Sequence, residues 1–237
     1  MAQVFHRSMN SVARIMVFGL PLMAMGAAVT GAVLYRSGYM TGRGEVVDQP
    51  VQFSHMHHVG ELGIDCRYCH TAVETSSFAG IPPTKTCMNC HQQMWSGSEK
   101  LNPVRESYRL DKSIPWERVH NLPDYVYFNH SIHIAKGVGC ISCHDRVDNM
   151  PFITQKKSLL MEWCLKCHRN PEPHLRPKDE VTSMTWTAAD FVDATTGEKK
   201  NPETNKPYTQ AEVGKKLKDL HHVRDPLTLT SCSMCHR

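Results

Sequence analysis

Ten cysteines, arranged as five copies of one motif, place the strongest constraint on this 237-residue chain. They form five C-x-x-C pairs, and a histidine follows each pair directly, so no cysteine is left over. A disulfide framework, paired zinc sites or a thioredoxin-like redox motif would use cysteine pairs without needing those histidines. C-x-x-C-H is the attachment sequence of c-type haem, so we expect five covalently bound haem c groups.

We number the motifs one to five in chain order and assign two roles within them. The covalent attachment residues are Cys66, Cys69, Cys87, Cys90, Cys140, Cys143, Cys164, Cys167, Cys232 and Cys235. The proximal iron ligands are His70, His91, His144, His168 and His236.

An internal repeat precedes the first and third motifs. Residues 51–58 read V-Q-F-S-H-M-H-H, and residues 126–133 read V-Y-F-N-H-S-I-H. Both contain F-x-H-x-x-H, and the distance to the following C-x-x-C-H differs by one residue. The repeat indicates a duplicated haem module.

The ratio of chain to cofactor predicts the fold class. Five haems would each have only about 40 residues around them, too few for separate apolar cores. We therefore expect a multihaem cytochrome c of mostly short α-helices and loops packed around five haems. The formal charge of +4 does not indicate a nucleic-acid partner, because the haem propionates would turn the loaded protein acidic.

Residues 15–35 form an uncharged, mostly apolar run bounded by Arg14 and Arg36, long enough to span a bilayer. A cleavable signal peptide is the alternative. We expect a cytoplasmic tail at 1–14, a single transmembrane anchor at 15–35, a connector at 36–50 and a pentahaem periplasmic domain at 51–237.

Three further elements are predicted within the haem domain. The run Gln155–His168 has near-helical apolar spacing, which places the fourth motif on a helix. Residues 168–208 are proline-rich and lack a motif, so we expect a haem-free surface excursion with a short hairpin around Val181–Trp186. Thr209 and Glu212 form a capping box that opens a helix ending near His221 or His222.

Histidines outside the motifs outnumber the five remaining axial positions. In the two repeats, an i, i+3 histidine pair on a helix can serve two haems. His120 is assigned to the second haem, and one of His221 and His222 to the fifth, whereas His57 and His174 are expected to be bystanders. The predicted distal ligands are His55, His58, His120, His130, His133, His221, His222 and Met150. Such a surplus leaves no iron open to substrate, which favours electron transfer over catalysis.

Two assignments concern residues other than histidine. The fourth haem lacks a histidine in this scheme, so Met150 is its first methionine candidate and Met161 its second, giving one His/Met haem. Guanidinium groups beside the motifs are candidates for holding propionates. They are Arg67, Arg146, Arg169 and Arg237.

The chain resembles known families in these features. F-x-H-x-x-H followed by C-x-x-C-H resembles the cytochrome c3 and c7 families of bis-histidine proteins. With five motifs and one apolar N-terminal segment, the sequences V-H-N-L-P-D-Y-V-Y-F at 119–128, R-V-D-N-M at 146–150 and M-E-W-C-L at 161–165 resemble the pentahaem subunit of alternative complex III. This likeness covers nearly the whole chain apart from residues 178–208.

The resemblance implies a bacterial inner-membrane quinol:acceptor oxidoreductase. Its membrane subunits oxidise quinol, an iron–sulfur subunit lies beside them, and haems pass electrons to a monohaem cytochrome c or an oxidase. The chain would then contact the lipid bilayer and not be an enzyme alone. The alternative is a NapC/NirT-like membrane quinol dehydrogenase, in which a single anchored multihaem chain handles quinol itself. A periplasmic haem enzyme is disfavoured by the ligand surplus.

The motif count predicts the mass of the mature protein. Because every cysteine belongs to a complete motif, the intact mass should exceed that of the polypeptide by five haems. Intact-mass spectrometry of the purified protein checks this, and a count of four or fewer would reject at least one motif.

Overall fold

The computed structural model describes residues 4–236 and forms two compact units, Met1–Arg43 and Gly44–Arg237. The first unit is helical: α1 spans Met9–Arg14, a π-helical turn spans Ile15–Gly19, α2 spans Leu20–Arg36 and α3 spans Gly38–Thr41. Pro21 accounts for the π turn, because proline has no N–H to donate to the carbonyl of Val17 and the regular ladder is interrupted there.

The continuous helix Met9–Arg36 has the length and composition to cross a membrane. It has 28 residues, an 18-residue stretch within it has a mean hydropathy of 1.9, and the side chains of that stretch lie outside any core. Apolar side chains such as Phe18 and Leu22 are exposed along it, as suits a helix solvated by lipid. It begins six residues before the expected span of 15–35, so part of the predicted tail is helical.

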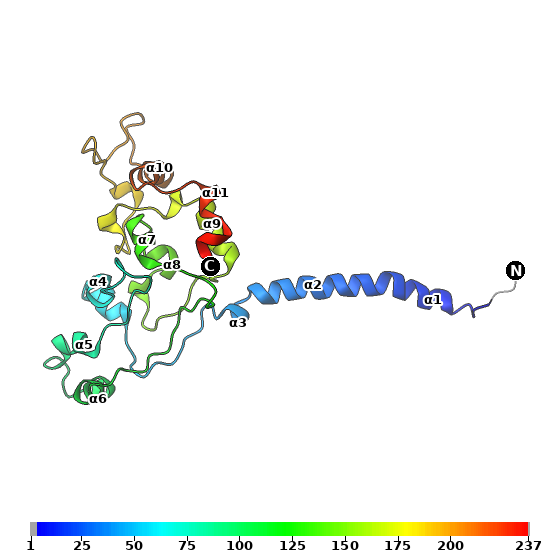
Figure 1. Ribbon diagram of the computed structural model, residues 1–237, viewed down its shortest axis with the longest axis horizontal. Coiled ribbons are helices and arrows are strands. Elements are labelled where there is room, and N and C mark those ends of the chain that lie inside the picture. The colour runs from blue at the N-terminus through cyan, green and yellow to red at the C-terminus, as the bar shows by residue number, and fades with distance from the viewer. Residues whose placement is uncertain (1–3, 237) are drawn as a thin grey trace. The chain divides into compact units, whose positions relative to one another are not determined.

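The second unit consists of short helices joined by loops, as the sequence predicts, and its described residues contain no named strand (Figure 1). Its α-helices are α4 (Cys66–Cys69), α5 (Thr84–His91), α6 (Asn102–Leu110), α7 (His130–Ala135), α8 (Ile141–His144), α9 (Met161–Arg169), α10 (Gln210–Leu220), α11 (Pro226–Leu229) and α12 (Cys232–Cys235). A π-helical turn spans Met56–Glu61, and 3₁₀ turns span Glu99–Leu101, Val147–Asn149, Glu172–His174, Lys178–Glu180 and Ala188–Asp190. The motifs coincide with α4, the end of α5, α8, α9 and α12.

The two helices predicted late in the chain are present with different accuracy. Helix α9 carries the fourth motif as expected, but it begins at Met161 instead of Gln155. Leu159 has a left-handed φ of 56°, which ends any helix approaching from Gln155. The capping box of α10 is confirmed: the Thr209 hydroxyl accepts from the Glu212 N–H, and the Glu212 carboxylate accepts from the Thr209 N–H at 2.7 Å.

The proline-rich segment at 168–208 supplies much of the larger apolar core, so its description as a surface excursion is wrong for its buried residues. Leu175 and Val181 are fully buried. Trp186, Phe191 and Tyr208 pack with Leu175 against Val213 and Leu217 of α10. The hairpin predicted around Val181–Trp186 is absent, because that stretch forms bends whose turn is held by the Ser183 hydroxyl accepting from the Trp186 N–H.

A second, smaller cluster lies around α5 and α6. Val51 from the first repeat packs with Met88, Val104 and Ile114. Cys87 of the second motif borders this cluster. The cluster therefore fixes the second motif beside the start of the first repeat.

Close backbone packing joins the two modules. The π turn Met56–Glu61 of the first module lies against the 3₁₀ turn Val147–Asn149 of the second. The Met56 N–H donates to the Met150 carbonyl at 3.0 Å, and a Cβ at Gly60 would collide with the Asp148 carbonyl oxygen. Only glycine fits there without movement.

The Gly60 contact predicts a position-specific loss of stability. Gly60→Ala should lower the stability of the haem-loaded protein by about 1–3 kcal/mol, because the added methyl forces the two modules apart. The measurement is the midpoint of thermal loss of Soret circular dichroism. Gly97→Ala is the matched control, since a Cβ there meets nothing within 4 Å. Equal midpoints for the two variants would contradict the packing argument.

Candidate haem-iron centres

The two repeats hold their histidines in nearly the same way. In the first, the Phe53 ring is stacked on His58 at 4.4 Å and edge-on to His55 at 4.9 Å. In the second, Phe128 is stacked on His133 at 4.6 Å and edge-on to His130 at 4.7 Å. The phenylalanine of F-x-H-x-x-H therefore fixes the planes of two imidazoles at once, and the duplication seen in the sequence extends to the ring geometry.

Backbone carbonyls fix the remaining freedom of most of these rings. The Nδ1 of His58 bonds the Ser54 carbonyl at 2.9 Å, that of His133 bonds the Asn129 carbonyl at 2.6 Å, and that of His130 bonds the Ser77 carbonyl at 2.8 Å. A carbonyl only accepts, so Nδ1 carries the proton and Nε2 keeps its lone pair. This is the tautomer that a metal ligand requires.

Motif histidines show the same pattern. Their Nδ1 atoms bond the carbonyls of Gly80 for His70 (2.7 Å), Met94 for His91 (3.1 Å), Leu229 for His168 (2.8 Å) and Tyr125 for His236 (3.0 Å). Each of these rings thus keeps the Nε2 lone pair with which it could bind an iron. Several of the accepting carbonyls come from distant segments, so the sequence motif alone did not reveal them.

Three pairs of imidazole rings have the separation that a shared iron requires. His58 lies 6.1 Å from His91, and His133 lies 6.2 Å from His168, measured between ring centroids. His130 lies 6.5 Å from His144, with ring planes 10° apart. An iron bound by two Nε2 atoms at about 2 Å each holds the ring centroids about 6 Å apart. These residues therefore fit bis-histidine haem at the second, fourth and third motifs.

Histidines of both modules gather around the first and third motifs. Burial, followed by the charges of the nearby His120 and His130, lowers the pKa of His144 to about 3. Burial, followed by the charge of His70, also lowers the pKa of His55 to about 4. All of these effects favour the neutral imidazole at pH 7, which is the form that binds iron.

Two buried nitrogens in this cluster lack a protein partner among the described residues: Nδ1 of His55 and Nε2 of His120. An unpaired buried nitrogen is costly, and an iron at Nε2 of His120 would remove that cost. His120 lies 4.5 Å from His144 between ring centroids, instead of beside the second motif, to which the sequence had assigned it. That separation leaves no room for an iron between these two rings.

The remaining predicted distal ligands do not face a motif histidine in a ring pair of this kind among the described contacts. His221 is buried, and its Nδ1 bonds the Lys136 carbonyl at 3.1 Å, whereas His222 is exposed with a left-handed φ of 50°. Met150 is buried, with its sulfur near the Thr154 hydroxyl at 4.0 Å, and Met161 is 65% exposed.

The two histidines that the sequence analysis expects to be bystanders have the following contacts. His57 is half-exposed and its Nδ1 contacts the Glu61 carboxylate at 2.7 Å. His174 is half-buried, and its carbonyl accepts from the Gly139 N–H at 3.2 Å.

Two of the predicted propionate residues are already engaged with carboxylates. Arg67 donates to Asp65 at 2.9 Å, and Arg146 donates to Asp148 at 2.6 Å. Arg169 is exposed at the end of α9, and Arg237 lies outside the described residues.

A basic residue that the sequence did not single out is close to the third motif. The Arg176 guanidinium lies over the Trp186 ring at 5.2 Å, and a Cβ on Gly139 would meet its side chain. Arg176 carries no local sequence signal, because its position depends on the folded 168–208 segment.

The first and third motifs touch each other through their thiols. The nearby Cys66 thiol, followed by burial, raises the pKa of the Cys140 thiol. The segment Val181–Thr182 joins the same two motifs: its carbonyls accept from the Cys140 N–H at 2.9 Å and from the Cys66 thiol at 4.0 Å.

Other thiols report further neighbouring motifs. Burial raises the pKa of Cys69, and the nearby Cys87 raises it further. Burial, followed by the nearby thiols of the fourth motif, raises the pKa of Cys143 to about 12. Burial raises the pKa of Cys164, followed by the charge of Cys235. Thiols of motifs one and two, three and four, and four and five therefore lie near one another.

Comparison with known proteins identifies a relative. No protein-family model matches the chain. The multihaem cytochrome c subunit of menaquinone reductase from Nitratidesulfovibrio vulgaris (strain Hildenborough) is 33% identical over 149 residues. The match covers 54% of this chain and 70% of the relative.

The ring geometry predicts which of two adjacent histidines controls a haem. His58→Met should raise the midpoint potential of one haem and add the ferric thioether charge-transfer band, because a thioether favours ferrous iron more than imidazole does. His57→Met, the matched control, should leave every potential unchanged, since His57 faces Glu61. Redox titration with optical detection checks both variants. A raised potential in the His57 variant alone would refute the assignment.

Proposed function

This chain belongs to the family of multihaem cytochrome c subunits that includes the menaquinone reductase subunit of N. vulgaris, and on that basis we propose that it relays electrons through five haem c groups. The observation that carries the proposal is the set of ring pairs about 6 Å apart at three motifs. When bound, each haem supplies an iron that gains and loses one electron.

Two protein ligands on an iron leave no position for a substrate. Phe53 and Phe128 fix the ring planes, and the carbonyl partners fix the tautomer, so the ligands change little between oxidised and reduced states. Such rigidity suits electron transfer, which gains from ligands that do not rearrange. We therefore propose that the chain carries electrons within a larger complex and performs no substrate chemistry alone.

The distal ligands are proposed from the same geometry. We assign His58 to the second haem, His130 to the third and His133 to the fourth. His133 replaces Met150 and Met161 at the fourth haem, because its ring already faces His168 at 6.2 Å.

The first and fifth haems are assigned on other grounds. By correspondence of the two repeats, His55 is assigned to the first haem, with His120 as the alternative ligand in the same cluster. His221 is preferred to His222 for the fifth haem, because it is buried and its ring is held by a carbonyl. With this set, Met150 is left without an iron, and a His/Met haem is not required.

The proposed setting is a membrane complex similar to alternative complex III. The exposed apolar helix Met9–Arg36 would anchor the chain and pack on membrane subunits that hold the quinone site, since one helix offers little wall for such a pocket. The haem unit would lie on the periplasmic side. An iron–sulfur subunit and a monohaem cytochrome c or an oxidase are the proposed electron partners.

The direction of electron flow has two candidates. The primary proposal sends electrons from a quinol-oxidising assembly to a cytochrome c or an oxidase. The opposite direction, from a soluble donor to menaquinone, is favoured by the name of the N. vulgaris relative, which is a reductase. Bis-histidine ligation throughout would give low potentials and support that second direction.

An activity assay separates these proposals. The isolated chain in detergent should accept electrons from dithionite and deliver them to a cytochrome c, yet it should not oxidise menaquinol until its membrane and iron–sulfur partners are added. The assembled complex is assayed with menaquinol plus a ferric cytochrome c of higher potential than menaquinone, and with menaquinone plus a ferrous cytochrome c of lower potential, so that both arms are downhill and the faster arm gives the direction. Menaquinol oxidation by the isolated chain at the rate of the complex would instead identify a single-chain quinol dehydrogenase.

A further inference from the structure

The order of the haem sites in space differs from their order along the chain. The junction between the first and third motifs shows this best. The Cys66 and Cys140 thiols are neighbours although they are far apart in sequence. The Val181 carbonyl accepts from the Cys140 N–H at 2.9 Å, and the adjacent Thr182 carbonyl accepts from the Cys66 thiol at 4.0 Å. Both the N–H and Nδ1 of His130, which faces the third motif, donate to the Ser77 carbonyl that follows the first, at 3.2 and 2.8 Å. The first and third sites are therefore direct neighbours.

The second site lies on the other side of the first. The Cys87 thiol is close to Cys69, and the Asn89 amide donates to the Tyr68 hydroxyl at 3.1 Å, which joins the two motifs. His58 precedes the first motif in the chain, and its ring faces His91 of the second motif at 6.1 Å. The described contacts of the second motif thus lead back to the first.

The fourth site follows the third because one helix serves both. His130 and His133 lie one turn apart on α7, and they face His144 and His168 respectively. A turn of helix rises about 5 Å, so the two sites are held close together. The thiols of Cys143 and the fourth motif agree with this placement.

The fifth site continues from the fourth. The His168 Nδ1 donates to the Leu229 carbonyl of α11 at 2.8 Å, and α11 packs against α9. Cys235 lies near Cys164. The fifth motif is held in turn by the Tyr127 N–H, which donates to the Cys235 carbonyl at 2.8 Å.

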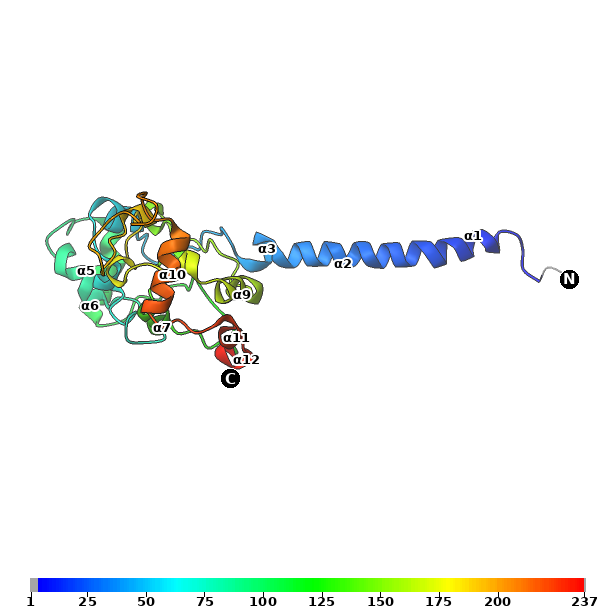
Figure 2. The same cartoon turned by 90° about the horizontal axis from the view of Figure 1, so that it is seen from above.

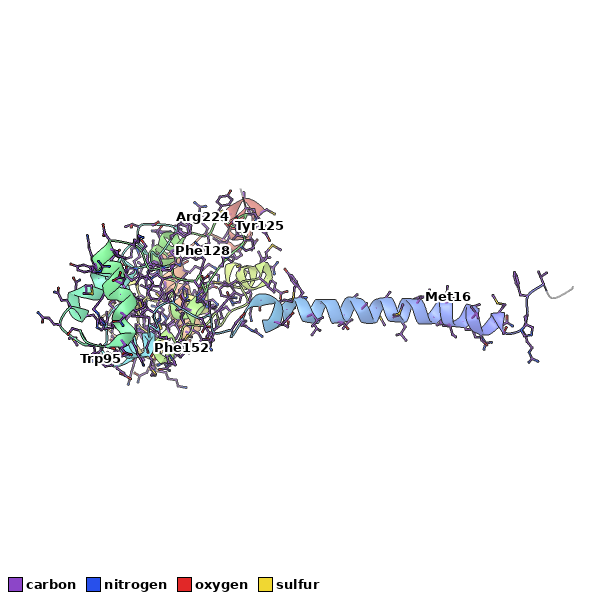
Figure 3. All side chains as sticks on the ribbon, turned by 90° about the horizontal axis from the view of Figure 1, so that it is seen from below. Met16, Trp95, Tyr125, Phe128, Phe152 and Arg224 are labelled. Atoms are coloured by element: carbon purple, nitrogen blue, oxygen red, sulfur yellow. The ribbon has the colours of Figure 1, made fainter. Side chains whose placement is uncertain are left out.

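The two motifs left at the ends lie on opposite sides of the haem unit. Both views place α5 apart from the red C-terminal segment that contains α12, which Figure 2 labels (Figures 1 and 2). Figure 3 shows Trp95, next to the second motif, far from Tyr125, whose ring lies 5.8 Å from His236 of the fifth motif. Trp95 and Tyr125 are each 66% exposed, so both ends reach the surface of the described unit.

We propose that the five haem sites form a single file in the order second, first, third, fourth, fifth, so that electrons enter at one of the two terminal sites and leave at the other. This inference rests on the proposed function, in that all five motifs carry haem. With haem held at all five motifs, each step would transfer one electron, oxidising a ferrous iron and reducing the ferric iron of the next site, with no covalent bond formed or broken. The first motif in the chain is then an internal site of the file. The two modules meet where the first motif of one lies beside the first motif of the other, that is, at motifs one and three.

Iron positions in the haem-loaded, full-length protein test the order. Crystals grown in detergent are measured at the iron absorption edge, and each anomalous peak is assigned to its motif from the traced chain. We expect the nearest neighbours to be second–first, first–third, third–fourth and fourth–fifth, with the second and fifth irons farthest apart. A second-motif iron lying closest to the third, fourth or fifth iron would overturn the order.

A pair of variants checks the assignment. Cys87→Ala with Cys90→Ala should remove a peak at one end of the file, whereas the matched change Cys66→Ala with Cys69→Ala should remove a peak with neighbours on both sides. The reverse pattern overturns the order, and if either variant fails to fold, the native map alone decides. Five irons in another order would refute the file and leave the relay standing, whereas fewer than five irons would refute the proposed five-haem function itself.

Discussion

Hydrogen bonds from imidazole Nδ1 atoms to backbone carbonyls are the interaction on which the haem unit depends. His168 bonds Leu229, His236 bonds Tyr125 and His130 bonds Ser77, so each bond joins segments that are distant in sequence. A ring reaches its ligating orientation only when those segments have come together. The histidine ligands are therefore oriented only as the chain folds. A change in a distant loop can shift the carbonyl that the loop contributes, and with it the orientation of the ligand at an iron.

The apolar clusters of the haem unit are too small to account for its organisation alone. One cluster gathers around Trp186 and α10, and the other around Met88 and α6. The motif cysteines are mostly half-buried, and Cys87 borders the second cluster. In a chain this rich in loops, covalently attached porphyrin rings would supply the apolar surface that completes the core. Each thioether bond also shortens the loops available to the unfolded chain, as a cross-link does.

Local signals in the sequence predicted the features that depend on a few adjacent residues. The motifs, the repeat, the apolar helix and the capping box of Thr209 belong to this class. Features that depend on how distant segments meet were missed. Nothing near Leu159 indicates its left-handed backbone, and Trp186 lies in a proline-rich stretch without periodicity yet belongs to the larger core. The facing of His133 and His168 depends on how two separate helices come together, which counting histidines along the chain does not reveal; that count proposed Met150 for the fourth haem.

The single turn of α7 has a mechanical consequence for the pair of sites it serves. His130 and His133 are attached to the same rigid backbone, so a thermal motion that displaces one ring carries the other with it. Separating the third and fourth centres would require that turn to unwind and the stacking of Phe128 on His133 to break. The distance for electron tunnelling between those two centres should therefore change little when the surrounding loops move. Electron transfer between them should show little conformational gating, even in a unit made largely of irregular backbone.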